Sequence, residues 1–279
     1  MNRIFLRYPG GLDRAVTFSM DDGVQQDVWF IDLLEKYGMR GTFNLNSTRF
    51  ITRDHVYPEG KVWRAMVDED VLPTYTRSSA DVACHSATHP TLKNASEAEI
   101  ADEILTDRIN LEKRFGRIIT GLAIPNGPYD ATTIDVGKRC GLTYMRTVRS
   151  SYSFEFPKEL CPFDPTCAYD DEQLPSIIER FFTERCKEDA FLLYIWGHTY
   201  CFEENNQWNE VEELVRTLAH HDKVWYASDA EIFDYALKWK MIEKSADGHI
   251  LYNPTDITLW FADRDGYTFS IAPGKEKHM

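Results

Sequence analysis

The sequence has no Cys-x-x-Cys pair, no long apolar run and a shortage of positive charge. Its six cysteines match no structural zinc spacing, and several lie in apolar surroundings. We therefore expect free thiols of an intracellular protein rather than a disulfide framework. No apolar run reaches the ~18 residues that a membrane helix needs, and the N-terminus has no apolar stretch of signal-peptide length. These absences predict a cytoplasmic protein, with a trimmed secreted one as the alternative.

The shortage of positive charge argues against nucleic acid and anionic membranes as main partners. The 279 residues carry 31 Lys and Arg against 45 Asp and Glu, a net charge of -14, whereas both polyanions need a positive protein face. Apolar residues make up 43% of the chain, which is typical of a globular protein with a substantial core. The length suits one large domain, alone or with a small appendage, and leaves the oligomeric state open.

Seven runs of apolar, β-branched or aromatic residues predict strands, and most are separated by stretches with helical periodicity. Strands that alternate with helices predict βα units around a parallel sheet, either open and doubly wound or curled into a barrel. No Gly-x-Gly-x-x-Gly follows the first run, which argues against a dinucleotide site. The predicted strands are Ala15–Ser19, Thr42–Asn46, Asp81–His85, Ile118–Ile124, Thr143–Val148, Phe191–Trp196 and Lys223–Ala227.

After about residue 241 the pattern changes to short runs of strand type. We predict two parts, a barrel-like domain over 1–241 and a small β appendage over 242–279 that packs on or near it. The runs are His249–Tyr252, Ile257–Ala262 and Tyr267–Ile271, with a hairpin turn at Asp265-Gly266.

The most informative motif is a short apolar strand, beginning at Val16, that ends in Asp21, Asp22 and Gly23. Successive side chains of a strand point to opposite faces, but two neighbours can address one site where the backbone turns. One acid can then hold a metal ion while the other handles a proton. Asp and Gly are also the commonest turn residues, so an ordinary turn is the better explanation of the pair when it is taken alone.

Three histidines follow at the ends of later predicted strands. His85 and His89 are four residues apart, a spacing at which two imidazoles can bind one metal ion. With Asp22 they would leave metal positions open, as catalytic sites require. His198 follows a buried strand and can exchange a proton near neutral pH, although a structural histidine is an equal alternative. Enzymes of this architecture build their sites at such strand ends.

Together these motifs resemble the polysaccharide deacetylases, carbohydrate esterase family four, and indicate a divergent member. The family pattern runs Thr-Phe-Asp-Asp-Gly, His-Ser/Thr-x-x-His-Pro, Arg-Pro-Pro-Tyr-Gly and a late strand ending in His. The resemblance covers roughly residues 14 to 228 and agrees in order and spacing. The corresponding segments here are Thr17 through Gly23, His85 through Pro90, Ala123 through Gly127, and Trp196-Gly197-His198.

This resemblance implies an α/β fold, a distorted and incomplete (β/α) barrel of about seven strands. Asp22, His85 and His89 would bind a divalent metal, Zn²⁺ in the first place and Co²⁺, Mn²⁺, Ni²⁺ or Fe²⁺ otherwise. Asp21 would be the general base, and His198 the general acid that protonates the leaving amine. The implied enzyme is a metal-dependent hydrolase of C–N bonds other than peptide bonds, which deacetylates an N-acetylated or O-acetylated sugar.

The resemblance also bears on the substrate side of the site. The backbone N–H of Asn126, at the position of the family's Tyr, would help to hold the oxyanion. An aromatic set that includes Tyr129 and Trp196 could stack on the rings of a small carbohydrate or oligosaccharide, although core or rim packing is the better explanation of any single member. The other members are Trp63, Tyr200 and Trp208.

Two departures from the family pattern concern the base. Ser19 and Met20 stand just before the acid pair, which indicates an insertion or a bulge. Ala123 stands where the family has the Arg that orients the base. The sequence leaves open whether Arg146 or Arg149 replaces that Arg.

Three other functions remain open from the sequence. Some relatives of this fold hydrolyse cyclic amides. The missing Arg is also compatible with a catalytically impaired carbohydrate-binding relative, although the metal ligands, Asp21 and His198 are all kept. Two histidines and one carboxylate are the facial triad of non-haem iron oxygenases as well, but those enzymes place it on an all-β fold and in another order.

Overall fold

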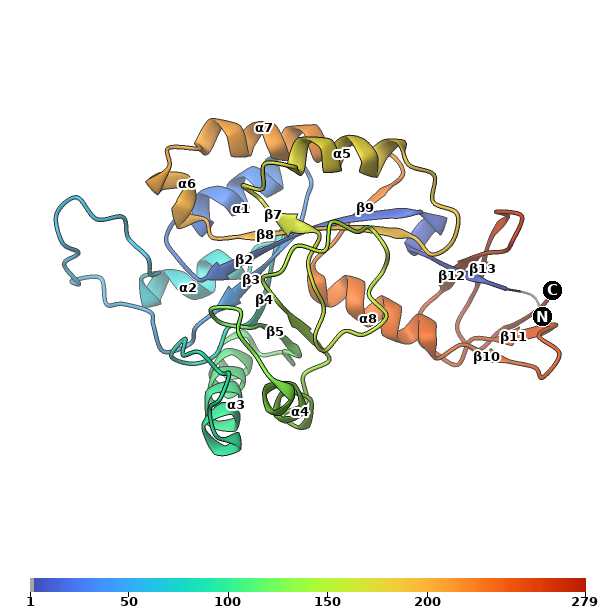
Figure 1. Cartoon of the computed structure of the whole chain (residues 1–279), viewed down its shortest axis with the longest axis horizontal. Coiled ribbons are helices and arrows are strands. Elements are labelled where there is room, and N and C mark those ends of the chain that lie inside the picture. Colours follow the sequence, from blue (N-terminus) through green and yellow to red (C-terminus); the bar gives the residue numbers. More distant parts are fainter. Residues whose placement is uncertain (1–2) are drawn as a thin grey trace.

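A curled sheet of parallel strands forms the centre of the protein in the computed structural model, which describes residues 3–279 (Figure 1). From edge to edge its strands are β6 (Tyr144–Arg146), β5 (Gly121–Ala123), β4 (Ala80–Cys84), β3 (Gly41–Leu45), β2 (Arg14–Asp22), β8 (Phe191–Gly197) and β7 (Cys167–Ala168); β9 (Val224–Tyr226) pairs with the start of β2. The edge strands β6 and β7 do not pair with each other. The predicted distorted, incomplete (β/α) barrel is thus confirmed.

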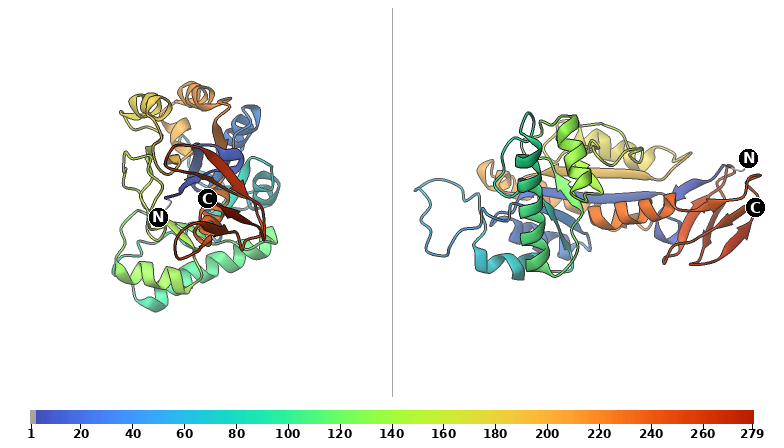
Figure 2. Two further views of the ribbon diagram at one scale, coloured as in Figure 1. Left: turned by 90° about the vertical axis from the view of Figure 1, so that its right-hand side faces the viewer. Right: turned by 90° about the horizontal axis from the view of Figure 1, so that it is seen from below.

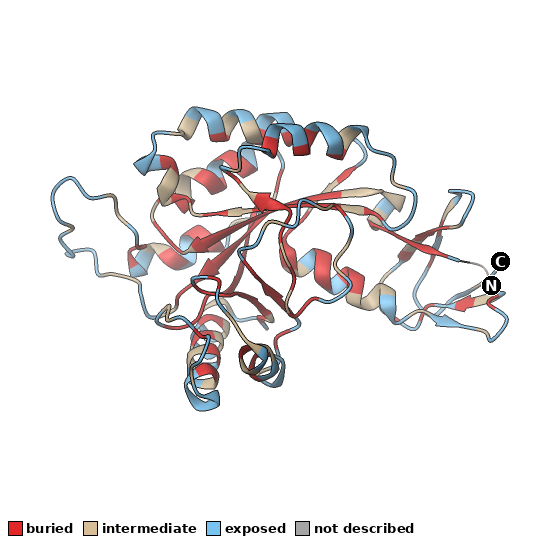
Figure 3. Ribbon diagram, viewed as in Figure 1, coloured by how far each residue is buried: buried red, intermediate tan, exposed pale blue. Residues whose placement is uncertain are grey.

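Most helices cover the outer face of the sheet and turn their buried sides toward it (Figure 3), whereas the last helix begins inside the barrel, where Asp229 accepts hydrogen bonds from Thr17 and Tyr194. They are α1 (Asp27–Lys36), α2 (Asp68–Tyr75), α3 (Glu97–Phe115), α4 (Ala131–Arg139), α5 (Leu174–Thr183), α6 (Tyr200–Glu204), α7 (Trp208–Leu218) and α8 (Asp229–Lys240). A capping box of Ser96 and Glu99 begins α3, and Ser228 with Glu231 begins α8 in the same way. Viewed end-on, the helices surround the sheet on most sides (Figure 2, left).

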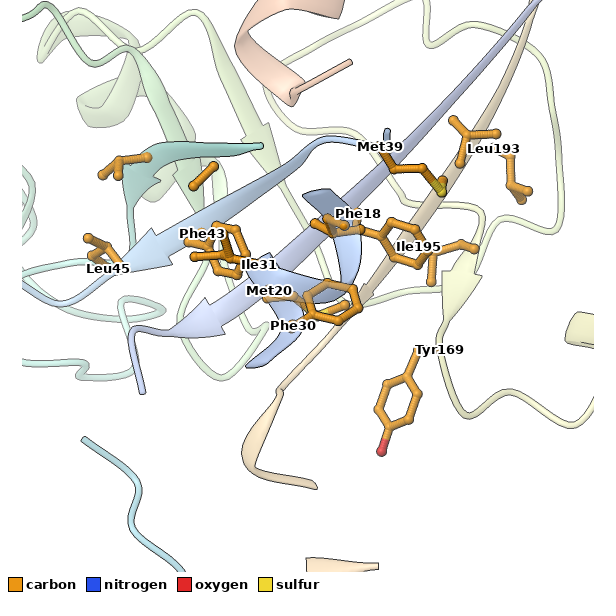
Figure 4. Close-up of a cluster of buried hydrophobic side chains, with 14 of the residues drawn as sticks. Phe18, Met20, Phe30, Ile31, Met39, Phe43, Leu45, Tyr169, Leu193 and Ile195 are labelled. Atoms are coloured by element: carbon orange, nitrogen blue, oxygen red, sulfur yellow. The ribbon is translucent and has the colours of Figure 1, made fainter. Parts of the chain in front are cut away.

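The central strand β2 separates an apolar outer face from a polar inner face. Phe18 and Met20 point outward and pack with Phe30 of α1 (Figure 4). The alternate residues Ser19 and Asp21 point inward, where both accept hydrogen bonds from an asparagine of β3. This period of two follows from strand geometry, and it places a carboxylate inside the barrel.

Strand β2 carries no bulge before the acid pair. Its parallel register with β3 runs unbroken from Phe18 to Asp22, and its register with β8 runs unbroken from Arg14 to Met20. Ser19 and Met20 are therefore regular strand residues, which removes the bulge that the sequence left open.

The two ends of the chain meet in small antiparallel sheets at the end of the barrel away from the carboxyl ends of the parallel strands (Figures 1 and 2). Because β1 comes from the N-terminus, this small β structure is not confined to 242–279. Neither β1 nor β7 was predicted, since strands this short show no alternation. One sheet contains β1 (Phe5–Arg7), β12 (Leu259–Ala262) and β13 (Thr268–Ile271), and the other β10 (Glu243–Lys244), β11 (Ile250–Tyr252) and β14 (Glu276–His278).

All six cysteines are free. Over residues 3–279, no helix has the length and apolar character needed to span a membrane.

Candidate metal and catalytic site

A cavity of about 450 Å³ opens at the carboxyl ends of β2, β4 and β8. Loops that follow neighbouring strands also line it. This is the edge at which barrel enzymes gather residues from separate strands. Of the eight site residues proposed from the sequence, Tyr129 alone does not line the cavity. The seven that line it are Asp21, Asp22, His85, His89, Asn126, Trp196 and His198.

Asp22, His85 and His89 converge on one point of the cavity. Their ligand atoms all lie within 4.8 Å of one another. The Oδ1 atom of Asp22 is 3.7 Å from Nε2 of His85 and 3.4 Å from Nε2 of His89. That Oδ1 atom is buried and has no hydrogen-bond partner. A buried carboxylate oxygen without a partner is costly, and a cation held between these three atoms would satisfy it.

Unusual backbone angles turn these side chains into the cavity. Strand alternation would send Asp22 to the face opposite Asp21, but φ of 81° at Asp22 and 67° at Gly23 turns the chain. His89 has φ of 65° and Asn126 has φ of 60°. Residues other than glycine rarely adopt positive φ, and such strain gathers at functional sites.

His85 is held in the form that a metal ligand requires. Its Nδ1 lies 2.8 Å from the carbonyl oxygen of Ala123, which can only accept, so Nδ1 carries the proton and Nε2 is left with its lone pair. Burial lowers the pKa of His85 and favours the neutral ring. The backbone N–H of His85 donates to the Asp107 carboxylate on α3 at 2.9 Å, and Asp107 also accepts from the N–H of Ser47 at 2.8 Å.

The two oxygens of Asp21 have different surroundings. Oδ1 accepts hydrogen bonds from the Arg146 guanidinium and, at 2.9 Å, from Nδ2 of Asn44. Oδ2 faces the cavity, 4.0 Å from Nε2 of both His85 and His198. Burial by itself would raise the pKa of Asp21, but Arg146 and the two histidines outweigh it and hold that pKa below its ordinary value. Asp21 is therefore an ionised carboxylate with one oxygen free to act.

Arg146, and not Arg149, contacts Asp21 in place of the arginine that is absent at Ala123. Strands β5 and β6 pair in register with Ala123 opposite Arg146, so the guanidinium reaches Asp21 from the strand next to the family's position. Arg146 is 1% exposed, and its guanidinium lies 4.8 Å from the ring centroid of Trp196. Arg149 instead pairs with Asp164 at the surface. An arginine inside a predicted buried strand was the sequence signal for this role.

His198 lies on the other side of the cavity from the metal-type cluster, which consists of Asp22, His85 and His89. Its Nε2 is 4.0 Å from Oδ2 of Asp21 and 3.9 Å from Oδ2 of Asp22. The next residue, Thr199, donates to Asp27 at the start of α1, and Asp27 also accepts from Tyr75 of α2 at 2.5 Å. This buried carboxylate, which no sequence pattern singled out, ties the turn after β8 to the turn after β2.

The residues proposed for the substrate side separate into two groups. Asn126 is exposed at the cavity, and its backbone N–H donates to no acceptor within residues 3–279. Trp196 and Tyr200 line the wall. Tyr129 instead packs at the edge of the hydrophobic core. Trp208 packs on Trp29 with ring centroids 4.7 Å apart, and Trp63 stacks on Tyr57 at 4.9 Å.

The donor set fits a divalent metal ion. Two imidazole Nε2 atoms and one unpartnered carboxylate oxygen are typical ligands of zinc and its neighbours in the first transition series. Three protein ligands also leave coordination positions for substrate and water.

Comparison with known proteins points to one family. The family model for polysaccharide deacetylase matches residues 10–145, and no curated protein matches the sequence. A family 4 carbohydrate esterase from Streptomyces lividans, solved with acetate, is 15% identical with a TM-score of 0.51, over 77% of this chain and 93% of its own.

Two further solved structures are similar to this chain. The esterase domain of a multidomain xylanase from the hindgut metagenome of Trinervitermes trinervoides is 15% identical with a TM-score of 0.54, over 80% of this chain and 91% of its own. A Streptococcus pyogenes deacetylase is 17% identical with a TM-score of 0.45, over 52% of this chain and 61% of its own. At such identities the structural likeness shows the fold, and the family model adds the sequence motifs. The chain therefore has the fold of these carbohydrate esterases, and its residues 10–145 match the polysaccharide deacetylase family model.

Proposed function

We propose that this protein is a metal-dependent hydrolase that removes an acetyl group from an N-acetylated or O-acetylated sugar. The observation that carries the proposal is the convergence of Asp22, His85 and His89 beside Asp21 and His198 in one cavity. Zn²⁺, the metal we propose, would when bound polarise the acyl carbonyl and lower the pKa of water.

Asp21 is suited to be the general base. Its Oδ2 is free and faces the cavity, while Arg146 and Asn44 hold Oδ1. The lowered pKa keeps it ionised at neutral pH. Asp21 can therefore take the proton of the attacking water.

His198 would protonate the leaving amine, and Asn126 would stabilise the oxyanion that develops in the reaction. An amine leaves readily only when it is protonated, and His198 is 27% exposed at the cavity, so it can draw a proton from solvent and donate it. The backbone N–H of Asn126 is available for the oxyanion of the tetrahedral intermediate, where one such donor typically contributes ~2.7–4 kcal/mol.

The carbohydrate-binding alternative has less support from this site. A pure carbohydrate-binding relative would have no need for an ionised Asp21 held by a buried arginine, and the full set of five polar groups is kept. Hydrolysis of a cyclic amide uses the same groups, and the substrate test below separates it from deacetylation.

The test is acetate release from N-acetylated and O-acetylated sugars by the zinc-loaded protein. We expect turnover by the wild type and a loss of at least ~100-fold in Asp21→Asn, since a general base typically contributes 10²–10⁴-fold. Asp234→Asn, at an exposed carboxylate of α8, is the matched control. The proposal is wrong if no acetylated sugar is turned over with Zn²⁺, Co²⁺, Mn²⁺, Ni²⁺ or Fe²⁺ present.

A further inference from the structure

The cavity contains two arginines that the proposed reaction does not use. Arg49 and Arg64 both lie on the long segment between β3 and α2 that projects beyond the barrel (Figure 1) and both line the cavity beside the catalytic groups. Their charges are balanced differently. Arg64 donates to the Glu204 carboxylate, with Nε at 2.9 Å, and its guanidinium lies 4.3 Å from the ring centroid of Tyr200. Arg64 is therefore paired and stacked.

Arg49 has no such partner within residues 3–279. The only carboxylate within 4.0 Å of its guanidinium there is Asp22, whose Oδ1 lies 3.9 Å from Nη1 and thus beyond hydrogen-bond distance. That oxygen is the one that faces His85 and His89. Its negative charge would be shared with a cation in the active protein, so it cannot also neutralise the guanidinium.

With the proposed divalent cation bound, the charge balance of the cavity would be positive. Arg146 neutralises Asp21, and Glu204 neutralises Arg64. With a divalent cation on Asp22, the charge of the cation exceeds that of its one carboxylate, and Arg49 adds a further positive charge. A partly enclosed site with excess charge of one sign favours a ligand of the other sign.

We infer that the substrate carries an oxyanion, a carboxylate or a phosphate, close to the acyl group that is cleaved, and that Arg49 receives it. A guanidinium presents paired N–H donors that match either oxyanion bidentately. The Arg49 side chain is 44% exposed and lines the cavity, so a ligand in the cavity can reach it. The inference rests on the proposed function and specifies its substrate as an acidic N-acetylated or O-acetylated sugar.

The experiment compares three N-acetylated hexosamines, one uncharged, one with a carboxylate and one with a phosphate. We expect the zinc-loaded wild type to prefer one acidic sugar over the uncharged one in kcat/KM. Arg49→Gln should lower kcat/KM for that acidic sugar roughly 10- to 100-fold, the loss expected for charge-assisted hydrogen bonds, and change the uncharged sugar less than about 3-fold. Arg49→Lys should recover part of the loss. The acid that responds identifies the oxyanion.

Arg53→Gln is the matched control. Arg53 lies on the same segment, outside the cavity, paired with Asp70 at 2.8 Å. It should leave all three rates unchanged.

A binding measurement separates the two proposals. Calorimetric titration of Asp21→Asn with the three sugars reports affinity without turnover, and we expect tighter binding of an acidic sugar that is lost in the Asp21→Asn, Arg49→Gln double variant. If the wild type deacetylates all three sugars equally and Arg49→Gln lowers all three alike, Arg49 serves the common product acetate and the inference is overturned while the proposed function stands. If no sugar is deacetylated but the acidic ones bind through Arg49, the proposed function is overturned, and Arg49 remains an oxyanion-binding residue of a site with another reaction.

Discussion

The proposed general base, Asp21 on β2, depends on an arginine of the edge strand β6, although β5, β4 and β3 lie between the two strands in the sheet. Asp21 is 2% exposed, and Arg146, itself 1% exposed, supplies the charge that keeps it ionised. Removing one member of a buried ion pair leaves the other uncompensated, which typically costs about 3–5 kcal/mol of stability. The same loss changes the protonation of the base.

Arg146→Gln should move the acidic limb of the pH profile of kcat/KM to higher pH. Arg146 lowers the pKa of Asp21, so its removal raises that pKa, and the active carboxylate form is then lost at a higher pH than in the wild type. Arg149→Gln, at the surface pair with Asp164, should leave the limb in place. An unshifted limb in Arg146→Gln would show that another group sets the ionisation of Asp21.

Metal binding also depends on single residues. Replacing His89 with Ala removes one of three proposed ligands, so we expect the bound zinc, measured by elemental analysis after dialysis, to fall well below one ion per chain. His221→Ala, at an exposed histidine away from the cavity, should retain the ion. Full zinc occupancy in His89→Ala would exclude this residue as a ligand.

At the scale of elements, helix α3 braces the strand ends that carry the site. Asp107 projects from α3 and accepts from the backbone N–H groups of His85, after β4, and Ser47, after β3. It therefore fixes one proposed ligand through the main chain rather than through the imidazole. Partners of this outer shell commonly change metal affinity 10- to 100-fold when removed.

Asp107→Ala should accordingly weaken zinc binding by about 10-fold or more and lower the free energy of unfolding by ~1–3 kcal/mol, because the N–H of Ser47 loses its acceptor and the buried N–H of His85 keeps only the Leu45 carbonyl. Competition titration and chemical denaturation measure the two effects. Asp102→Ala, on the exposed side of the same helix, is the control and should change neither quantity. Unchanged zinc affinity in Asp107→Ala would show that His85 keeps its place without this brace.

At the scale of the whole molecule, buried carboxyl groups make stability depend on pH. Burial raises the pKa of Asp27, Asp107 and Asp229 to about 7 in each case. An acid with a higher pKa in the folded state binds more protons there than in the unfolded chain, so stability falls as the pH rises between the two pKa values. For these acids that interval runs from ~4 to about 7.

Asp229→Asn should remove one such contribution. Asp229 lies inside the barrel, where it accepts from the hydroxyls of Tyr194 at 2.5 Å and Thr17 at 2.9 Å, away from the metal-type cluster. Relative to the wild type, the variant should gain stability on the order of 2 kcal/mol between pH 5 and pH 7, since each unit of pKa difference is ~1.4 kcal/mol. Denaturant unfolding at both pH values measures it. A difference that does not grow with pH would contradict the raised pKa.

Features encoded within single segments could be predicted from the sequence. The run of apolar and β-branched residues in β2 is such a local pattern, and it predicted the strand; the capping box of α3 is likewise encoded within one short segment. Shorter strands such as β7, with two residues, contain no pattern to detect.

The sequence by itself determined the strand that ends in Asp21 and Asp22, the order of the later histidines and the alternation of strands with helices, because these depend on residue types at short spacing. Only the tertiary structure decided that Arg146 serves Asp21, that Arg49 enters the cavity and that Tyr129 lies outside it. The reason is physical. Which strands become neighbours and where a long loop returns are set by packing across the whole sheet, and no local pattern in the chain carries that information.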